Sequence, residues 1–228
     1  MDKALVLGGT GGVGAAVARE LVDMGVETWV TGRRESGPQG TQCISLTITQ
    51  SGQTLEKLER EYPHWDDTQY LVCAFGPYLE APLSLTSADQ WSWVVDLNLV
   101  LPGMLVSRIL PGMRSNRFGK IILFGATGSD HIRGRKLTAP YQAAKTGLGV
   151  LAKSVAMEAG GDLVECNVLC PGYIVTEYMP TPLKERATRR LGPRKTVSPQ
   201  EYRSLFRWLL IENQGIVNGA VISAGQGL

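Results

Sequence analysis

The chain has 228 residues, of which 43% are hydrophobic and 19% are charged. This length and apolar content suffice to bury one core, so we expect a single domain over residues 1–228. The formal net charge of +2, without long basic runs, excludes the electrostatic pattern typical of nucleic-acid-binding proteins. No basic leader or run of about 18 uncharged apolar residues is present, which predicts a cytoplasmic protein without a membrane partner.

Short segments rich in Val, Ile and Leu alternate with segments of helical periodicity, which predicts an α/β fold with a parallel sheet covered on both faces. The expected strands are Lys3–Leu7, Glu27–Thr31, Gln42–Leu46, Gln69–Ala74, Lys120–Phe124, Val164–Leu169 and Ala220–Ser223. The expected helices are Val13–Met24, Thr54–Tyr62, Ala88–Leu99, Met104–Arg114, Tyr141–Ala159 and Pro199–Ile211. The connection between Thr31 and Gln42 is too short and turn-forming for a full helix, and Pro171–Pro182 is expected to be an active-site loop.

Cysteine usage gives no sign of a disulfide framework or a metal site. The four cysteines lie in or beside apolar segments without a paired CxxC spacing, and they are Cys43, Cys73, Cys166 and Cys170. We therefore expect buried, reduced thiols and no bound metal.

A glycine-rich turn, LGGTGGVG, lies directly between the first strand and the first helix. Gly8, Gly12 and Gly14 allow positive φ and the close approach of a pyrophosphate, whose charge the N–H groups at the helix start would favour. A tight turn without a ligand is the alternative, but the position after the first strand favours dinucleotide binding. Thr10 and Val13 of the same turn are included among the expected cofactor contacts.

The end of the second strand, WVTGRRE, indicates which dinucleotide is bound. Thr31 and Gly32 stand where an NAD site normally has an acidic residue, and Arg33 and Arg34 follow. Because a guanidinium pairs bidentately with phosphate, this pattern predicts recognition of the 2′-phosphate of NADP(H). Two solvated arginines in a loop are the alternative.

Four motifs in a fixed order resemble the short-chain dehydrogenase/reductase family over nearly the whole chain. They are LGGTGGVG, VVDLNL, YQAAK and PGYIVT, and their order resembles that of 3-oxoacyl-[acyl-carrier-protein] reductases. The resemblance implies a single-domain, doubly wound Rossmann fold with seven parallel strands, and an oxidoreductase that reduces a carbonyl with NADPH. It also implies a homodimer or homotetramer assembled through Ala88–Arg114 and Tyr141–Ala159.

Tyr141 and Lys145 are spaced so that they share one face of a helix. We expect the ammonium to lower the pKa of the phenol and make Tyr141 a general acid near neutral pH. An ordinary surface contact one turn apart is the alternative. By resemblance, Lys145 also holds the nicotinamide ribose, and Asn98 anchors a water that relays protons. Alternatively, Asn98 caps a helix end.

Further cofactor contacts are implied by the resemblance. The segment CAFG, with Ala74 and Gly76, replaces the Asn-Asn-Ala-Gly of the family, and Thr47 replaces an acidic residue that meets the adenine. In the loop beside the nicotinamide, Ile174 corresponds to the contact with the carboxamide and Thr176 to the contact with the phosphate. Pro171 and Gly172 open this loop.

The serine hydroxyl of the family has no direct counterpart here. Aligning the fifth strand places Ala126 at its position, whereas counting back about thirteen residues from Tyr141 gives Gly128. Ser129 is slightly favoured as the replacement and Thr127 follows. Because one lost oxyanion donor costs roughly 10²–10³ in rate, carbonyl reduction stays the leading function. A dinucleotide-binding regulator or scaffold is the alternative, and a structural subunit is a third.

Two groups of basic residues bear on the substrate, which is expected to be a small carbonyl compound, either free or linked to a carrier protein. The segment His131–Lys136 is either a solvated loop or a guide for an anionic substrate. The second group is either a solvated helix face or a contact for an anionic substrate or carrier, and it contains Arg186, Arg189, Arg190, Arg194 and Lys195.

Overall fold

The computed structural model describes residues 1–179, 181–191 and 197–225. They form a parallel seven-stranded sheet with the order β3-β2-β1-β4-β5-β6-β7. The strands are β1 (Lys3–Leu7), β2 (Glu27–Gly32), β3 (Thr41–Ser45), β4 (Thr68–Cys73), β5 (Gly119–Phe124), β6 (Val164–Pro171) and β7 (Val221–Ala224). The order runs outward in both directions from β1 and β4, so the expected doubly wound Rossmann fold is confirmed.

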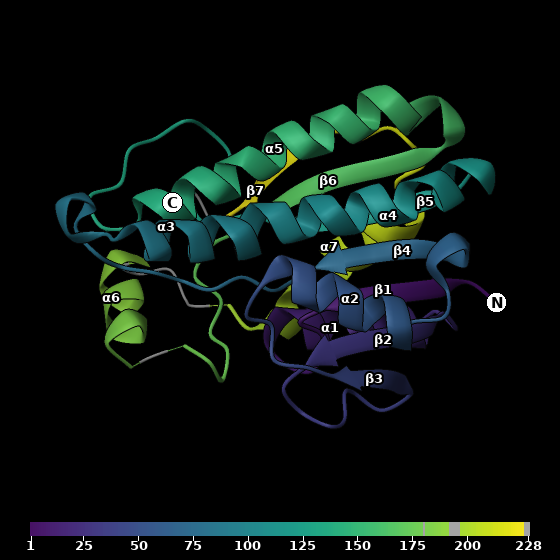
Figure 1. The fold of residues 1–228 in the computed structure, drawn as a ribbon, viewed down its shortest axis with the longest axis horizontal. Helices are drawn as coiled ribbons and strands as arrows, with labels where there is room; N and C mark the ends of the chain where they lie inside the picture. The colour runs from purple at the N-terminus through teal and green to yellow at the C-terminus, as the bar shows by residue number, and fades with distance from the viewer. Residues whose placement is uncertain (180, 192–196, 226–228) are drawn as a thin grey trace.

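Helices cover both faces of this sheet (Figure 1). They are α1 (Gly12–Asp23), α2 (Ser51–Glu61), α3 (Ala88–Val95), α4 (Leu101–Ser115), α5 (Ala139–Ala159), α6 (Thr181–Leu191) and α7 (Arg203–Arg207). Side chains from α2, α4 and α5 pack on one face of the sheet, whereas side chains from α1 and α7 pack on the other.

The central strand β1 shows how the sequence builds the two cores. Because successive side chains of a strand point to opposite faces, Leu5 and Leu7 enter the core beneath α2, α4 and α5. Ala4 and Val6 enter the core beneath α1 and α7. All four are fully buried, which explains why this strand is apolar at every position from Ala4 to Leu7 rather than at alternate ones.

The helical segments differ from the sequence-based expectation in two places. The helices expected at Ala88–Leu99 and Met104–Arg114 form one continuous helical segment, because a π-helical turn at Asp96–Val100 joins α3 to α4. The additional helix α6 begins at Thr181, within the segment expected to be a loop. As expected, no helix lies between β2 and β3, a connection that is described throughout.

The segment Ala88–Ser115 is long and apolar enough to cross a membrane by length and composition alone, with a mean hydropathy of 1.5 in its most apolar window. Half of that window is buried inside the protein. Leu97, Leu101, Leu105 and Ile109 are fully buried against the sheet. This helix is therefore part of the core of a globular domain.

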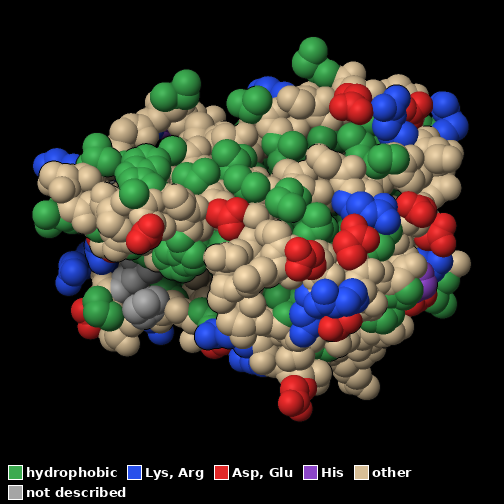
Figure 2. Space-filling view, viewed as in Figure 1, with side chains coloured by type: hydrophobic (Ala, Val, Ile, Leu, Met, Phe, Trp, Pro, Cys, Tyr) green, Lys and Arg blue, Asp and Glu red, His purple; other side chains and the backbone are tan. Residues whose placement is uncertain are grey.

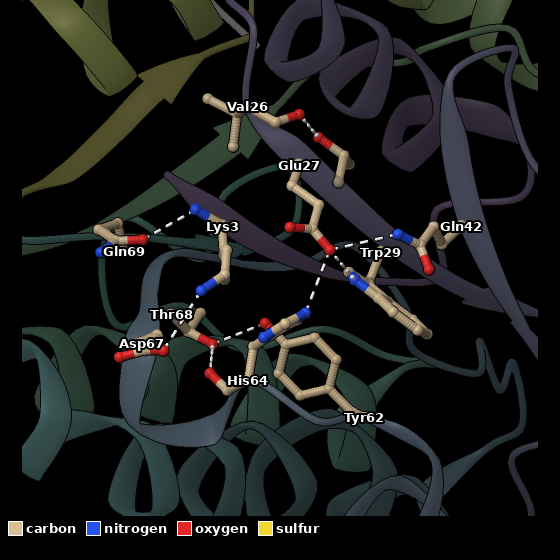
Figure 3. Close-up of polar contacts among 11 residues, drawn as sticks. Lys3, Val26, Glu27, Trp29, Gln42, Tyr62, His64, Asp67, Thr68 and Gln69 are labelled. Carbon is tan, nitrogen blue, oxygen red and sulfur yellow. Dashed lines mark hydrogen bonds and ion pairs between the residues drawn. The ribbon is translucent and has the colours of Figure 1, made fainter. Parts of the chain in front are cut away.

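A polar cluster ties β2 to the loop before β4 at the amino ends of the strands (Figure 3). Oε1 of Glu27 accepts hydrogen bonds from Trp29 Nε1 at 3.1 Å and Gln42 Nε2 at 3.2 Å, and it lies 3.1 Å from His64 Nε2. The bond from Trp29, followed by the proximity of His64, lowers the pKa of Glu27. Because ligands bind at the opposite end of such sheets, we assign this cluster to stability.

A buried ionic network lies at the same end of the sheet, between β5 and β6. Lys120 Nζ donates to Glu165 Oε1 and to the backbone oxygen of Asn213. Asn213 Nδ2 donates to the other carboxylate oxygen of Glu165 at 2.5 Å. Both charged side chains are less than a tenth exposed, so each depends on the other for compensation of its charge.

Candidate functional site

The glycine turn after β1 forms one wall of the site, at the carboxyl end of the sheet. Gly8 has φ +78° and Gly12 has φ +55°, a region that favours glycine. A Cβ on Gly14 would lie 2.3 Å from the backbone oxygen of Gly8, so only glycine lets α1 begin this close to β1. The turn thus has the positive-φ glycines and the close packing of a phosphate-binding turn.

An anionic side chain of the chain itself lies on this turn. The Gly12 N–H donates to Glu177 Oε1 at 3.2 Å, and Arg34 Nη2 lies 3.5 Å from the same oxygen. Arg34 also donates from Nη1 to the backbone oxygen of Thr10 at 3.2 Å, and its guanidinium lies 5.8 Å from the ring centre of Tyr178. The carboxylate shows that this position accepts an oxyanion, so the residues fit the phosphates of a dinucleotide.

The other residues expected to contact the dinucleotide lie around the same turn. Arg33 is exposed next to Arg34, and Val13 packs against the core beneath α1. The backbone N–H of Ala74 donates to Leu7 O at 2.9 Å, which holds the end of β4 against β1. Thr176 lies close to Gly12, because a Cβ on that glycine would be 3.6 Å from its methyl group.

Gly76, Asn98 and Lys145 meet at the end of β4, although they are far apart in the sequence. A Cβ on Gly76 would lie 2.1 Å from Asn98 Oδ1 and 3.0 Å from Lys145 Nζ. The glycine therefore leaves space for the amide and the ammonium to face one small volume. The sequence predicted all three as site residues, and the structure brings them together.

The π-helical turn at Asp96–Val100 sets the orientation of Asn98, which is fully buried. Its Nδ2 donates to the backbone oxygens of Val94 and Pro77, both at 2.9 Å. Its Oδ1 is buried without a hydrogen-bond partner in the described part of the chain. The alternative of a helix-end cap is wrong, because the helix continues through Asn98 into α4. The amide presents its acceptor towards Lys145. π-helical turns often occur at functional sites.

Tyr141 and Lys145 lie near the start of α5, as their spacing predicted. Lys145 Nζ lies 5.9 Å from the ring centre of Tyr141 and donates to Phe124 O at 2.8 Å. Tyr141 packs edge-on against Tyr78, with ring centres 5.2 Å apart. The two side chains therefore face the carboxyl end of β5 rather than the surface, so the alternative of an ordinary surface contact is wrong.

The expected direction of the Tyr141 pKa shift is wrong. Burial raises the pKa of the phenol above its ordinary value, and Tyr78 and Cys170 raise it further. Burial also lowers the pKa of Lys145 from 10.5 to about 8. Removal from water is the largest cause of both shifts. The phenol thus stays protonated at neutral pH.

The two candidate hydroxyls differ in their surroundings. Ser129 Oγ accepts from Ala126 N at 2.8 Å, donates to Ala126 O at 3.0 Å, and lies 3.2 Å from Cys170 Sγ. Thr127 Oγ1 makes one bond, to Pro171 O at 3.1 Å, and Thr127 lines the adjacent cavity. The preference for Ser129 is thus not supported by its position, because its hydroxyl stabilises its own loop.

A cavity of about 610 Å³ opens beside Tyr141. Its wall combines residues from the ends of β5 and β6, the start of α5, and the segment Arg133–Thr138. Residues named in the sequence analysis that line it are Ala126, Thr127, Arg133, Arg135, Lys136, Tyr141, Pro171, Gly172 and Arg186. The cavity is large enough for a small-molecule substrate.

Residues 2–186 match the family model described as short chain dehydrogenase. The chain belongs to the short-chain dehydrogenase family. It is 28% identical to the 3-oxoacyl-[acyl-carrier-protein] reductase MabA of Mycobacterium tuberculosis, over 98% of this chain and 91% of MabA. It is 26% identical to the acetoacetyl-CoA reductase of Shinella zoogloeoides, over 98% of this chain and 97% of that one.

A solved structure shows the same fold. It is that of a single-residue variant of the actinorhodin polyketide ketoreductase with NADPH, which has a TM-score of 0.83 and 22% identity. The likeness covers 100% of this chain and 97% of that chain.

The loop after β6 in this short-chain dehydrogenase connects the cavity to the glycine turn. Pro171, the last residue of β6, and Gly172, the first residue of the loop, lie in the cavity wall. Ile174 then forms a parallel bridge with Val197. Of the basic group late in the chain, Arg186 reaches the cavity and pairs with Glu80. Arg194 and Lys195, of the same group, lie outside the described residues.

Several cavity residues were missed by sequence analysis, and three of them contribute side chains of chemical interest. Tyr78 and Tyr173 contribute rings to the wall, and Gln142 contributes an amide. Gln142 follows Tyr141 directly, in a position where the spacing pattern allows any residue. Its burial beside the cavity becomes visible only in the structure, where the start of α5 packs against the cavity wall.

Proposed function

We propose that this short-chain dehydrogenase reduces the carbonyl group of a small molecule to an alcohol and uses NADPH. The observation that carries the proposal is the arrangement of Tyr141, Lys145 and Asn98. The phenol lines a cavity of substrate size. Lys145 Nζ and Asn98 Oδ1 face one small volume above Gly76. A proton donor and the groups behind it are thus positioned on one side of the cavity.

The cofactor supplies a hydride when it is bound. Tyr141 then donates its phenolic proton to the carbonyl oxygen, and its raised pKa keeps that proton in place at neutral pH. The Lys145 ammonium, 5.9 Å from the ring centre, stabilises the negative charge left on the phenol. The unpartnered Oδ1 of Asn98 accepts a hydrogen bond from a water that returns a proton.

Thr127 polarises the substrate carbonyl in this proposal. Its hydroxyl makes one bond, to Pro171 O at 3.1 Å, and it lines the cavity. Ser129 is the alternative, but its oxygen would first have to release Ala126. One such donor contributes roughly 10²–10³ in rate.

The residues that would hold NADPH follow the edge of the sheet. The turn with Gly8, Gly12 and Gly14 takes the diphosphate; the hydrogen bond from the Gly12 N–H to the Glu177 carboxylate supports this assignment. Arg33 and Arg34 take the 2′-phosphate. In this proposal Thr10, Val13, Ala74, Gly76, Lys145, Pro171, Gly172, Ile174 and Thr176 complete the contacts.

The cofactor choice is tested by titration of the protein with NADPH and NADH. We expect NADPH to bind more tightly, and Arg33→Ala/Arg34→Ala to reduce that difference. Equal affinities of the unaltered protein for the two nucleotides would contradict the assignment of the arginines.

The rival proposal is a dinucleotide-binding regulator or scaffold without catalytic activity. It is favoured by one observation, the closed hydrogen bonding of Ser129 with Ala126. The serine of the family is absent, and the hydroxyl of Ser129 is already bonded to Ala126, so this loop offers the substrate no free serine hydroxyl. The intact Tyr141 and Lys145 favour the reductase.

An assay of NADPH oxidation against a panel of ketones and 3-oxoacyl thioesters separates these proposals. We expect Tyr141→Phe to lower kcat/KM by about 10²–10⁴, and Tyr70→Phe, a buried tyrosine at the far end of β4, to leave it nearly unchanged. Turnover that survives Tyr141→Phe contradicts the mechanism. Tight NADPH binding without turnover supports the regulator, and no nucleotide binding supports a structural subunit.

Assembly as a homodimer or homotetramer and a cytoplasmic location are also proposed. Figure 2 shows hydrophobic side chains gathered over α4 and α5. Exposed apolar residues on α3 and α5 include Trp93, Val150 and Met157. Light scattering tests the assembly: Val150→Glu/Met157→Glu should shift it towards monomer, and an unchanged mass would contradict an interface on α5.

A further inference from the structure

The cavity wall is strongly biased towards positive charge. Four cationic side chains line it, Arg133, Arg135, Lys136 and Arg186, against one carboxylate, that of Glu80. The side chains of this wall therefore carry a net formal charge of +3. The whole chain carries only +2, so the positive charge is concentrated at the cavity.

The cations differ in how far they are already compensated. Arg186 pairs with Glu80, and Arg135 donates to the backbone oxygen of Thr127 at 3.2 Å. Arg133 and Lys136 are exposed at the rim, and no ion pair involves them in the parts of the chain that are described. Arg135 thus holds the segment in place, while Arg133 and Lys136 are available to an anion.

A second and independent observation lies deeper in the same cavity. Gln142 is 6% exposed, and its Nε2 is buried without a hydrogen-bond partner in the described residues. A buried donor without an acceptor is unfavourable, because it has lost its bonds to water without replacement. An oxygen atom of a bound molecule would satisfy it. Gln142 and Tyr141 line the same cavity, so that oxygen would lie in the cavity where the carbonyl is reduced.

We infer that the substrate carries its own anionic group, which Arg133 and Lys136 attract and whose oxygen Gln142 Nε2 binds. The inference rests on the proposed reductase activity and specifies its substrate class as an oxo acid. Such a compound places a carboxylate a few bonds from the carbonyl, which matches a cavity lined by both Gln142 and Tyr141. A phosphate on a carrier arm would supply the same charge at a greater distance from the carbonyl.

The test compares three probes that share one reacting group. Acetoacetate carries a carboxylate, methyl acetoacetate is neutral, and acetoacetyl-CoA carries remote phosphates. We expect kcat/KM for acetoacetate to exceed that for the ester by about tenfold, because the two exposed cations attract the carboxylate and the buried amide donates a hydrogen bond to it. The advantage should shrink at high ionic strength. A preference for the CoA thioester over both others would overturn the oxo-acid assignment.

Variants locate the effect. We expect Arg133→Gln/Lys136→Gln and, separately, Gln142→Leu to lower kcat/KM for acetoacetate more than for the ester. Lys153→Gln removes an exposed cation on the same helix as Gln142 but outside the cavity, so it should change neither value. Equal losses for acid and ester would overturn the assignment of an anion site.

Binding measurements make the outcome independent of turnover. Calorimetric titration with acetoacetate of the complex with NADP⁺, which has no hydride to transfer, should show binding that Gln142→Leu weakens several-fold. If no probe is reduced but acetoacetate binds in this manner, the reductase proposal fails and the anion site stands. If the ester is reduced while acetoacetate neither binds nor reacts, the anion site fails and the reductase proposal stands.

Discussion

Replacement of Lys145 by methionine should stabilise the fold at neutral pH while it abolishes the proposed reaction. A pKa that falls from 10.5 to about 8 corresponds to about 3 kcal/mol against the charged form. Methionine avoids this cost but leaves Phe124 O without the bond from Nζ, which costs about 1–2 kcal/mol. The net gain at pH 7 is about 1–2 kcal/mol, or roughly 2–8 °C in Tm for a chain of this size.

The stability gained by this substitution depends on pH, because the folded and unfolded states lose the Lys145 proton at different pH values. Between pH 8 and 10.5 the unfolded chain keeps the Lys145 proton while the folded chain has lost it. The unfolded state then binds more protons, so the stability of the unaltered protein rises with pH across this window. The advantage of Lys145→Met should therefore fall by about 3 kcal/mol and become a deficit near pH 10.5.

Urea unfolding at pH 7 and pH 10, monitored by tryptophan fluorescence, measures both effects. Lys153→Met is the matched control, because Lys153 lies on the same helix and also donates to a backbone oxygen, that of Gly219 at 3.2 Å, but is exposed. If the difference between Lys145→Met and the unaltered protein is the same at both pH values, burial does not control the charge of this lysine.

Three further predictions concern the glycine turn and the buried ion pair. Glu177→Gln should tighten NADPH binding about threefold to fivefold in calorimetry, since an exposed ion pair with Arg34 contributes up to about 1 kcal/mol. Glu185→Gln on α6 is the control and should leave the affinity unchanged. An unchanged affinity for Glu177→Gln would show that this carboxylate does not compete with NADPH. Gly14→Ala should abolish NADPH binding, because the new Cβ would lie 2.3 Å from the Gly8 oxygen. Gly52→Ala is the control, because a Cβ at that position would have no neighbour within 4 Å. Retained affinity in Gly14→Ala would contradict the close packing of this turn. Lys120→Met should cost about 3–5 kcal/mol in urea unfolding, and adding Glu165→Leu should recover most of it; no recovery would show that packing, not charge, is lost.

The architecture could be predicted because its signals are local. The strand Lys3–Leu7 has the expected bounds. Four consecutive apolar residues followed by a glycine turn are typical of a strand that is buried on both faces. Helix α6 was not assigned bounds, because Thr181–Leu191 is mostly polar and the short apolar stripe that buries Ala187 and Leu191 is a weak signal. The π-helical turn leaves no sequence signal either, so two helices were expected where one continues.

The site was predicted less completely, because several of its properties depend on burial and hydrogen bonding. The spacing of Tyr141 and Lys145 gave their common face but not the burial that raises the phenol pKa. The choice between Ser129 and Thr127 depends on which hydroxyl the loop already uses. Gln142 could not be found from a motif in which its position is unrestricted.

The π-helical turn at Asp96–Val100 has a consequence for how this helix can change during evolution. Such a turn holds one residue more than an α-helical turn. Deleting that residue would restore a regular α-helix without rotating α4, because the wider turn already absorbs the extra residue, so the apolar stripe of α4 would still face the sheet. The loss would be local, since the turn that directs the Asn98 amide towards Lys145 would disappear. A deletion here should therefore spare the fold while it removes the acceptor beside Lys145.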